Sequence, residues 1–196
     1  EIAALEADGI KVRDRLVVDP QATLIQQLHL AREDAAGLVE ACGSTGKGVG
    51  AARADRIMRI APIARDYPQT LGTLGRLESV APMARNGAYS LVQVEGTQGY
   101  GLGLHAGHFP FATSSDCTAI DFLAMAGISP WAFPQTAVDI WVVFRPYPIR
   151  VAGNSGPMRE ETTWGALGLG PEYTTVTKKM RRVGAWDGKL AAAAIA

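Results

Sequence analysis

Apolar residues recur at helical spacing over several stretches of the chain. After Asp19–Pro20, an N-cap residue followed by a first-turn proline, they repeat every three or four positions as far as Ala41, which predicts a long helix. The same spacing predicts a helix over residues 51–61, a weaker one over 71–83 and another over Thr118–Ala126. Helices therefore account for much of the predicted structure.

Three other segments have the pattern of β-strands. Ala137–Phe144 is the most β-like, Tyr89–Glu95 is predicted as a buried strand after a turn at Asn86–Gly87, and Tyr173–Thr177 is a shorter candidate. Strands that alternate with helices predict an α/β fold, in which a largely parallel central sheet is flanked by helices.

The ends of the chain do not have the pattern of natural termini. The first residue is not Met, and the last ten residues have the pattern of a helix without a terminator. We therefore expect residues 1–196 to be the central part of a single domain that continues beyond this chain.

The composition is that of a globular protein. The 196 residues are 47% hydrophobic, with 19 Lys+Arg against 19 Asp+Glu, which excludes collagen-like and disordered chains. No apolar run approaches the ~18 residues of a spanning helix and no secretory signal is evident, so we expect a cytoplasmic protein without a membrane partner. Zero net charge argues against nucleic acid as a partner. Cys42 and Cys117 lack metal spacing and are expected to be buried or half-buried thiols.

The first candidate for chemistry is the segment Gly43–Gly50, in which four of eight residues are glycine. Its amides and the hydroxyls of Ser44 and Thr45 suit an anion. It is not a P-loop, because the position five residues before Gly46 is not glycine and Lys47 is not followed by Ser or Thr. A plain connection between two helices explains the glycines equally well.

Three arginines follow this segment at three-residue steps within the helix predicted over 51–61. Arg53, Arg56 and Arg59 are expected to share one face of that helix. Arginine is also the preferred cation of the whole chain, with 14 Arg against 5 Lys. Its planar guanidinium suits phosphate and carboxylate groups.

The second candidate is Glu95–Ser115, which begins at the end of a predicted strand, where open α/β sheets bind ligands. Gln98 can both donate to and accept from a purine edge, and the hydroxyls at 113–115 suit a phosphate. An amide that only satisfies loop backbone is the alternative for Gln98. His105 and His108 are weak evidence for a metal, because no third ligand lies nearby in sequence.

The third candidate is Thr174–Arg182, where hydroxyls alternate with four cations, a combination that suits a dianion or a carboxylate. A solvated surface is the commoner meaning of such a run. Arg150 is a separate candidate, in a loop after the strand predicted at Ala137–Phe144.

Taken in order, these motifs resemble the adenylosuccinate synthetase family. That family has a Gly-Thr-Thr-Gly-x-Gly segment before a helix, then a Glu-Gly-x-Gln-Gly loop, an Arg-Val-Gly loop and a Thr-Thr-Gly-Arg-Arg-Arg-Arg turn. The matching segments here are Gly43 to Gly50, Glu95 to Ser115, Arg150 to Pro157 and Thr174 to Gly184.

The resemblance implies roles for individual residues. Thr45 and Thr113 match positions near the phosphate of the nucleotide substrate, Gln98 matches a catalytic position at the purine 6-position, and Arg59 matches an arginine that reaches across a two-fold homodimer. The implied nucleotide-binding set is Ser44, Thr45, Arg59, Gln98, Thr113, Arg150 and Val151, and the implied set for aspartate and triphosphate is Thr177, Lys179 and Arg181.

The resemblance also implies a reaction. The family transfers the γ-phosphoryl group of GTP to the 6-oxygen of a purine nucleotide, and the amine of L-aspartate then displaces phosphate, with Mg²⁺ as the metal. Fixed amides and cations stabilise the charge that develops in such a step. The expected partners are therefore a 6-oxopurine nucleotide, L-aspartate, a nucleoside triphosphate and a second subunit.

Some of the family's pattern is missing. The Gly-Asp-Glu-Gly-Lys-Gly-Lys loop with its catalytic aspartate and a later catalytic histidine do not occur in these residues, so no metal ligand is expected in this portion. The short stretch between Thr45 and Gln98, the loop 153–157 and the interrupted arginine run resemble the archaeal and phage branch. Some of its phage members use dGMP, which implies dGMP in place of IMP and ATP in place of GTP. Two other classes remain open, a non-catalytic nucleotide-binding module and a P-loop kinase-like NTPase.

Overall fold

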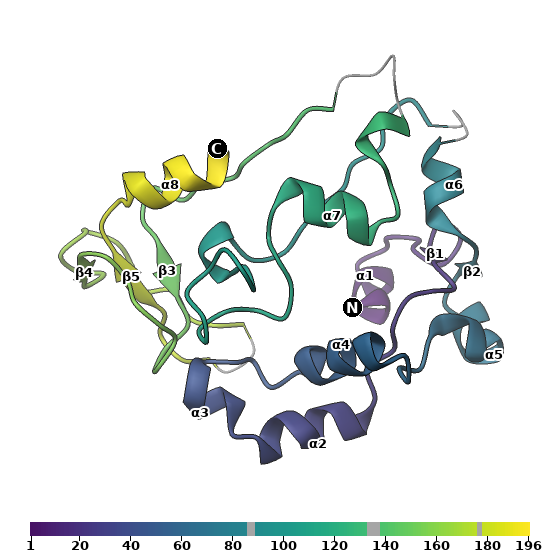
Figure 1. Ribbon diagram of the computed structural model, residues 1–196, viewed down its shortest axis with the longest axis horizontal. Helices are drawn as coiled ribbons and strands as arrows, with labels where there is room; N and C mark the ends of the chain where they lie inside the picture. The colour runs from purple at the N-terminus through teal and green to yellow at the C-terminus, as the bar shows by residue number, and fades with distance from the viewer. Residues whose placement is uncertain (86–88, 133–137, 176–177) are drawn as a thin grey trace.

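The computed structural model describes residues 1–85, 89–132, 138–175 and 178–196. Helices and short strands alternate along the chain, and Figure 1 shows them arranged around a central irregular segment. In chain order the elements are α1 (Ile2–Ala7), β1 (Val17–Val18), α2 (Gln27–Ala35), α3 (Leu38–Cys42), α4 (Val49–Met58), the 3₁₀ turn Ala64–Asp66, α5 (Pro68–Gly72), β2 (Arg76–Leu77), α6 (Val80–Arg85), the 3₁₀ turn Tyr100–Leu102, α7 (Ala119–Met125), the 3₁₀ turn Pro130–Ala132, β3 (Ile149–Arg150), β4 (Glu161–Thr162), β5 (Arg182–Gly184) and α8 (Gly188–Ile195).

The helix predicted from Asp19–Pro20 to Ala41 is wrong in its first third and interrupted later. Asp19 does cap, but it caps a turn, since its carboxylate accepts from the amide of Gln21 at 2.8 Å. The helix α2 begins only after Gln26, whose amide donates to Nδ1 of His29 at 2.9 Å in a capping box. Gly37, with φ of 61°, then separates α2 from α3.

The helix predicted over 71–83 is also wrong. Helix α5 ends at Gly72, strand β2 follows, and α6 begins at Val80, whose amide donates to the Asp19 carboxylate at 2.9 Å. A contact between residues 61 positions apart thus decides where this helix begins. By contrast, α4 and α7 lie close to their predicted ranges, and Thr118 caps α7 by accepting from the amide of Asp121. The terminal α8 is capped by Asp187, which accepts from two amides.

The α/β class is confirmed, although the sheets differ from the expectation. Strands β1 and β2 pair in parallel, Val17 opposite Arg76, whereas β3, β5 and β4 form an antiparallel sheet with β5 in the middle. Residues 89–95 and 138–144 form neither helix nor strand and join no ladder among the described residues. Their apolar side chains are exposed, Trp141 to 88%, so the prediction of a buried strand at Tyr89–Glu95 is wrong here.

The remaining β-patterns are partly outside the described residues. Tyr173 pairs with Met180 in an isolated antiparallel bridge, which confirms extended backbone at that end of the Tyr173–Thr177 candidate. Residues 176–177 lie outside the described residues, as do the turn predicted at Asn86–Gly87 and the first position of Ala137–Phe144. Cys42 and Cys117 are free and half-buried, as expected.

Two of the regions with buried side chains position the pocket described below. One is the contact of α2 with α4, where Ala51 and Ala52 on α4 allow the helices to approach, and the other is the sheet around Val183 and Trp164. Figure 1 shows α2 to α4 below the central segment and the β3–β5–β4 sheet with α8 to its left. The segment between Tyr100 and α7 lies between these two packed regions.

Candidate functional site

A pocket of about 470 Å³ lies where three chain segments meet. The C-terminal end of α3 and the segment after it form one wall, the loop 151–154 forms the second, and Thr174, Thr175, Lys179 and Arg181 form the third. The polar and charged groups that these walls contribute include Glu40, Ser44, Thr45, Asn154, Lys179 and Arg181.

The first wall depends on a close approach at Gly43. This residue ends α3 in the left-handed region, with φ of 72°, and a methyl group built on it would lie 2.9 Å from Cβ of Ser155. Only glycine combines that conformation with that contact. The side-chain amide nitrogen Nδ2 of Asn154 donates to the carbonyl of Ala41 at 3.0 Å, so the first two walls are joined directly.

The second wall is held from behind by two arginines. Arg150 donates to the carbonyl of Ser155 at 2.5 Å and to that of Gly101 at 3.4 Å, and Arg182 donates to the Ser155 hydroxyl and the Gly156 carbonyl. Burial lowers the pKa of the Arg150 guanidinium, and the nearby Arg182 lowers it further. Val151 lines the pocket, whereas Arg150 uses its donors on the backbone behind it.

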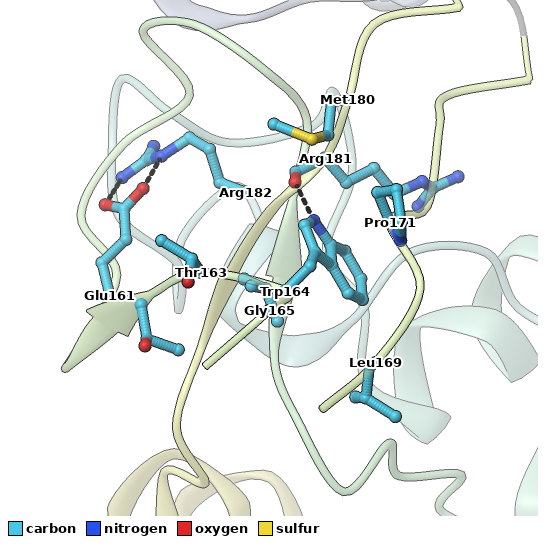
Figure 2. A pocket seen from close by; sticks show the side chains of 11 residues that line it. Glu161, Thr163, Trp164, Gly165, Leu169, Pro171, Met180, Arg181 and Arg182 are labelled. Carbon is cyan, nitrogen blue, oxygen red and sulfur yellow. Dashed lines mark hydrogen bonds and ion pairs between the residues drawn. The ribbon is translucent and has the colours of Figure 1, made fainter. Parts of the chain in front are cut away.

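The third wall contains two adjacent arginines with different surroundings. Arg181 lines the pocket, and its Nε donates to the carbonyl of Tyr173 at 3.4 Å. Arg182 points away and forms a bidentate pair with Glu161, at 2.7 and 2.5 Å. The Arg182 hydrogen bond lowers the pKa of Glu161, and the Glu161 carboxylate raises that of Arg182. The Arg181 carbonyl accepts from Nε1 of Trp164 at 2.8 Å. Both residues line a second pocket, together with other residues of 161–165 and 180–183 (Figure 2).

The second glycine-rich segment is closed upon itself by backbone hydrogen bonds. The amide of Thr113 donates to the carbonyl of Leu102 at 2.7 Å, and the amide of Leu104 donates to that of Ser115 at 3.1 Å. A methyl group built on Gly50 would lie 3.9 Å from Cβ of Ser114, so the two glycine-rich segments touch. Gln98 is exposed, with φ of 63°, and its side-chain oxygen accepts from the Thr97 hydroxyl.

The three arginines after the first glycine segment do not share a face, which corrects that expectation. Arg53 lies against the sulfur of Met125 on α7, and Arg56 donates to the carbonyl of Gln21. Arg59 is the C-cap of α4, with φ of 65°, and donates to Ile57. Because α4 is about 15 Å long at 1.5 Å per residue, Arg59 lies far from the glycine-rich end of the helix.

The structure thus brings together five of the predicted site residues in one pocket and leaves others outside it. The five are Ser44, Thr45, Val151, Lys179 and Arg181. Gln98, Thr113, Arg59 and Arg150 do not line it, and Thr177 lies outside the described residues. Glu40 lines the pocket and was not predicted from the sequence.

A histidine–aspartate pair in the second segment was also missed. Asp116 accepts from the amide of His105 at 2.9 Å and from its Nδ1 at 2.5 Å. The Asp116 carboxylate raises the pKa of His105, and the His105 hydrogen bond lowers that of Asp116. Both residues lie in irregular backbone, where side chains follow no regular period, so no pattern in the sequence predicts the pair.

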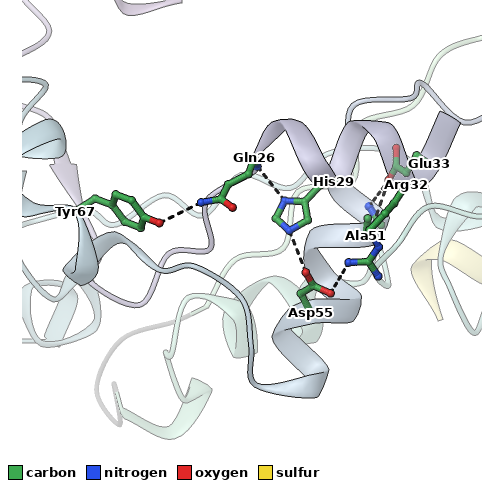
Figure 3. A network of polar contacts seen from close by, with 8 residues as sticks. Gln26, His29, Arg32, Glu33, Ala51, Asp55 and Tyr67 are labelled. Carbon is green, nitrogen blue, oxygen red and sulfur yellow. Dashed lines mark hydrogen bonds and ion pairs between the residues drawn. The ribbon is translucent and has the colours of Figure 1, made fainter. Parts of the chain in front are cut away.

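A buried polar network joins α2 to α4 (Figure 3). His29, 1% exposed, contacts Asp55 at 3.1 Å, and Arg32 donates to the other oxygen of Asp55 at 2.6 Å. The hydrogen bond from Arg32 lowers the pKa of Asp55 despite its burial. In the same network Glu33 accepts from backbone amides at the start of α4.

Two classes of feature are absent from the part of the chain that the structure describes. No group of three or more His, Cys, Asp and Glu side chains there could hold a metal ion. No helix there is both long and apolar enough to cross a membrane.

Known proteins resemble this chain over nearly its whole length. The archaeal adenylosuccinate synthetase of Archaeoglobus fulgidus is 36% identical over 97% of this chain and 56% of its own. The N6-succino-2-amino-2'-deoxyadenylate synthase of Vibrio phage phiVC8 is 37% identical over 86% of this chain and 50% of its own. The chain spans about half the length of the curated relatives that it matches.

A solved structure resembles the fold closely. The succinoaminodeoxyadenylate synthetase of cyanophage S-2L, bound to dGMP and to dATP as an energy donor, has a TM-score of 0.80 and 31% identity, over 99% of this chain and 58% of that one. The family model for adenylosuccinate synthetase matches residues 80–196, which is more than half of the chain. The chain therefore belongs to the adenylosuccinate synthetase family.

Proposed function

We propose that this chain forms the substrate-binding part of a ligase that joins L-aspartate to C6 of a 6-oxopurine nucleotide, either IMP or dGMP. The observation that supports this most is the meeting of three predicted motifs, represented by Thr45, Val151 and Arg181, in one pocket of about 470 Å³. Ligand pockets commonly have volumes of about 300 to 1,000 Å³. The pocket is therefore large enough for a nucleotide.

The chemistry of its walls supports a division of roles. Ser44 and Thr45 offer hydroxyl donors to the phosphate of the nucleotide, and Val151 offers an apolar surface to the ribose. Lys179 and Arg181 offer cations to the carboxylates of aspartate or to the triphosphate, together with Thr177. Thr113 completes the phosphate site, and Arg150 supports the loop beside the ribose.

The proposed reaction has two steps. The γ-phosphoryl group of GTP or ATP is transferred to the 6-oxygen, the amine of aspartate then forms a bond to C6, and the bond from C6 to the phosphorylated oxygen breaks as phosphate leaves. Gln98 binds at the purine 6-position, where it stabilises charge in the transition state. Mg²⁺, when bound to the triphosphate, neutralises its charge. The described residues offer no cluster of three His, Cys, Asp or Glu side chains that could hold this ion.

Assembly and location are part of the same proposal. We propose that Arg59, at the end of α4 remote from the glycine segment, serves the pocket of a second subunit in a two-fold homodimer. We further propose that residues 1–196 are the central part of a single domain of a cytoplasmic enzyme. The cyanophage relative is bound to dGMP and to dATP as an energy donor, which supports dGMP with an adenine nucleoside triphosphate such as ATP as the alternative substrate pair.

Isothermal titration of the whole protein with IMP and dGMP, followed by assay with aspartate and GTP or ATP, tests the function. Binding of one nucleotide and release of phosphate that depends on aspartate are the expected results. Nucleotide binding without turnover would favour a non-catalytic nucleotide-binding module. Binding of neither nucleotide would contradict the proposal.

A further inference from the structure

The start of α4 is already occupied by an anion that belongs to the protein. Glu33 of α2 is 4% exposed, and one carboxylate oxygen accepts from the amide of Gly48 at 2.8 Å. The other oxygen accepts from the amides of Gly50 at 2.7 Å and Ala51 at 3.3 Å (Figure 3). These are among the amides that a helix leaves without an intrahelical partner. A substrate phosphate cannot use them while Glu33 is in place.

The glycines at this end of the segment serve the approach of α2. Gly48 has φ of 76°, and a methyl group built on it would lie 3.0 Å from both Cβ of His29 and the backbone nitrogen of Leu30. A methyl group on Gly50 would lie 3.1 Å from the Glu33 carboxylate itself. The close approach that the glycines permit at positions 48 and 50 is therefore to a neighbouring helix.

The first residues of the segment Gly43–Gly50 line the pocket. Ser44 and Thr45 line the pocket, and the Ser44 hydroxyl accepts from the amide of Gly46 at 3.2 Å. Only two residues separate Thr45 from Gly48, the first residue that Glu33 holds. Fixing residues 48–51 against α2 therefore restricts where the hydroxyls of Ser44 and Thr45 can lie.

We propose that Glu33 is a positioning residue, which anchors the start of α4 and thereby sets Ser44 and Thr45 against the pocket without touching the substrate. The positioning of Ser44 and Thr45 for a substrate rests on the proposed function, whereas the anchoring of α4 by Glu33 does not. Asp55, held by His29 and Arg32, fixes the same two helices further along α4. The fold can therefore persist when Glu33 is replaced.

The anchoring is tested without any substrate, by amide hydrogen exchange in the whole protein. In Glu33→Ala the amides of Gly48, Gly50 and Ala51 should exchange about tenfold faster or more, since a charge-assisted hydrogen bond is lost. Formate or acetate at high concentration should slow them again by occupying the vacated space, with no effect on the wild type. Unchanged exchange in the variant would overturn the inference, whatever the protein binds.

The positioning is tested by steady-state kinetics of the same variant and of Glu33→Gln, which keeps the shape of the side chain. The nucleotide KM should rise about tenfold or more while kcat changes little, and formate should restore the KM of Glu33→Ala. Asp34→Asn, an exposed neighbour on α2, is the matched control and should leave KM unchanged. Faster exchange with an unchanged KM would overturn the positioning role. Failure of the wild type to bind a purine nucleotide would contradict the proposed function and leave the exchange result to decide the anchoring.

Discussion

Arg181 and Arg182 are adjacent in the chain but have different surroundings. Arg181 faces the pocket, while Arg182 donates to Glu161 and to the loop 155–156 behind it. The run of cations at 178–182 was open to two meanings in the sequence, a ligand site or a solvated surface. The structure places Arg181 in the wall of the pocket and makes Arg182 a support for the loop, while a ligand at Arg181 stays a prediction.

Replacing these two arginines should therefore have separable effects. Arg181→Ala should raise the KM for aspartate about tenfold or more, with little loss of stability, because a charge-assisted contact to substrate is lost. Arg182→Ala should lower the free energy of unfolding by roughly 1–2 kcal/mol, because several hydrogen bonds of a half-buried guanidinium are lost. Urea unfolding and initial rates measure the two effects. Equal loss of stability in both variants would contradict the assignment.

The pair of His105 and Asp116 should make the second glycine-rich segment sensitive to pH. The raised pKa of His105 means that its contribution to stability is full below 6.5, its ordinary value, and is lost as pH rises through the folded pKa. The lowered pKa of Asp116 means that its contribution is present above 3.8 and is lost as pH falls through the folded pKa. The contact is therefore complete between about pH 4 and pH 6.5.

An NMR titration of the His105 ring tests this pair. In Asp116→Asn the pKa of His105 should fall toward its ordinary value, because the carboxylate that favours the imidazolium is gone. Asp121 still raises this pKa, but by less than Asp116 does in the wild type. An unchanged titration of His105 in the variant would contradict the pairing.

At the scale of elements, the sequence predicted well where local signals decide the structure. Helix α7 has its own cap and its own apolar spacing, and it lies within one residue of the predicted range at each end. The predictions over 19–41 and 71–83 were wrong because distant contacts override local spacing there. The contact of Val80 with Asp19 and the pairing of β1 with β2 have no signature in either segment alone.

Gly37 and Gly48 have similar backbone conformations but different surroundings, so alanine substitutions at the two positions can distinguish backbone strain from a steric clash. Gly37 and Gly48 both lie in the left-handed region, but a methyl group on Gly37 meets nothing within 4 Å, whereas one on Gly48 meets α2 at 3.0 Å. Gly37→Ala should cost about 1–2 kcal/mol of stability from strain. Gly48→Ala should cost roughly 1–3 kcal/mol more, because α2 must move. Equal losses on urea unfolding would contradict the packing at Gly48.

At the scale of the whole molecule, the sequence predicted the convergence of motifs better than the sheet. Three of the four motifs contribute residues to one pocket. The sequence could predict this because the order of the motifs matches that of the family to which the chain belongs. The roles of Gln98 and Thr113 stay predictions. Glu33 was beyond prediction, because it lies 15 residues before the first amide that it binds and no periodic pattern links the two.

Segments 89–95 and 138–144 have strand-like sequences but belong to no sheet among the described residues. Their patterns are those of buried strands, yet Leu91 is 77% and Val143 is 92% exposed. A strand needs a partner to satisfy its backbone and to cover its apolar face. No such partner occurs among the described residues, and the curated relatives are nearly twice as long as this chain. Apolar spacing indicates that a segment can form a strand, but it does not identify which other segment pairs with it or buries its apolar side chains.

A crystal structure of the whole protein with IMP or dGMP and with aspartate tests the central claim most directly. We expect the nucleotide phosphate to lie within hydrogen-bond distance of Thr45 and a carboxylate of aspartate to lie against Lys179 or Arg181, in the same pocket. A nucleotide bound elsewhere, with Ser44, Thr45 and Arg181 all out of contact with either ligand, would contradict it.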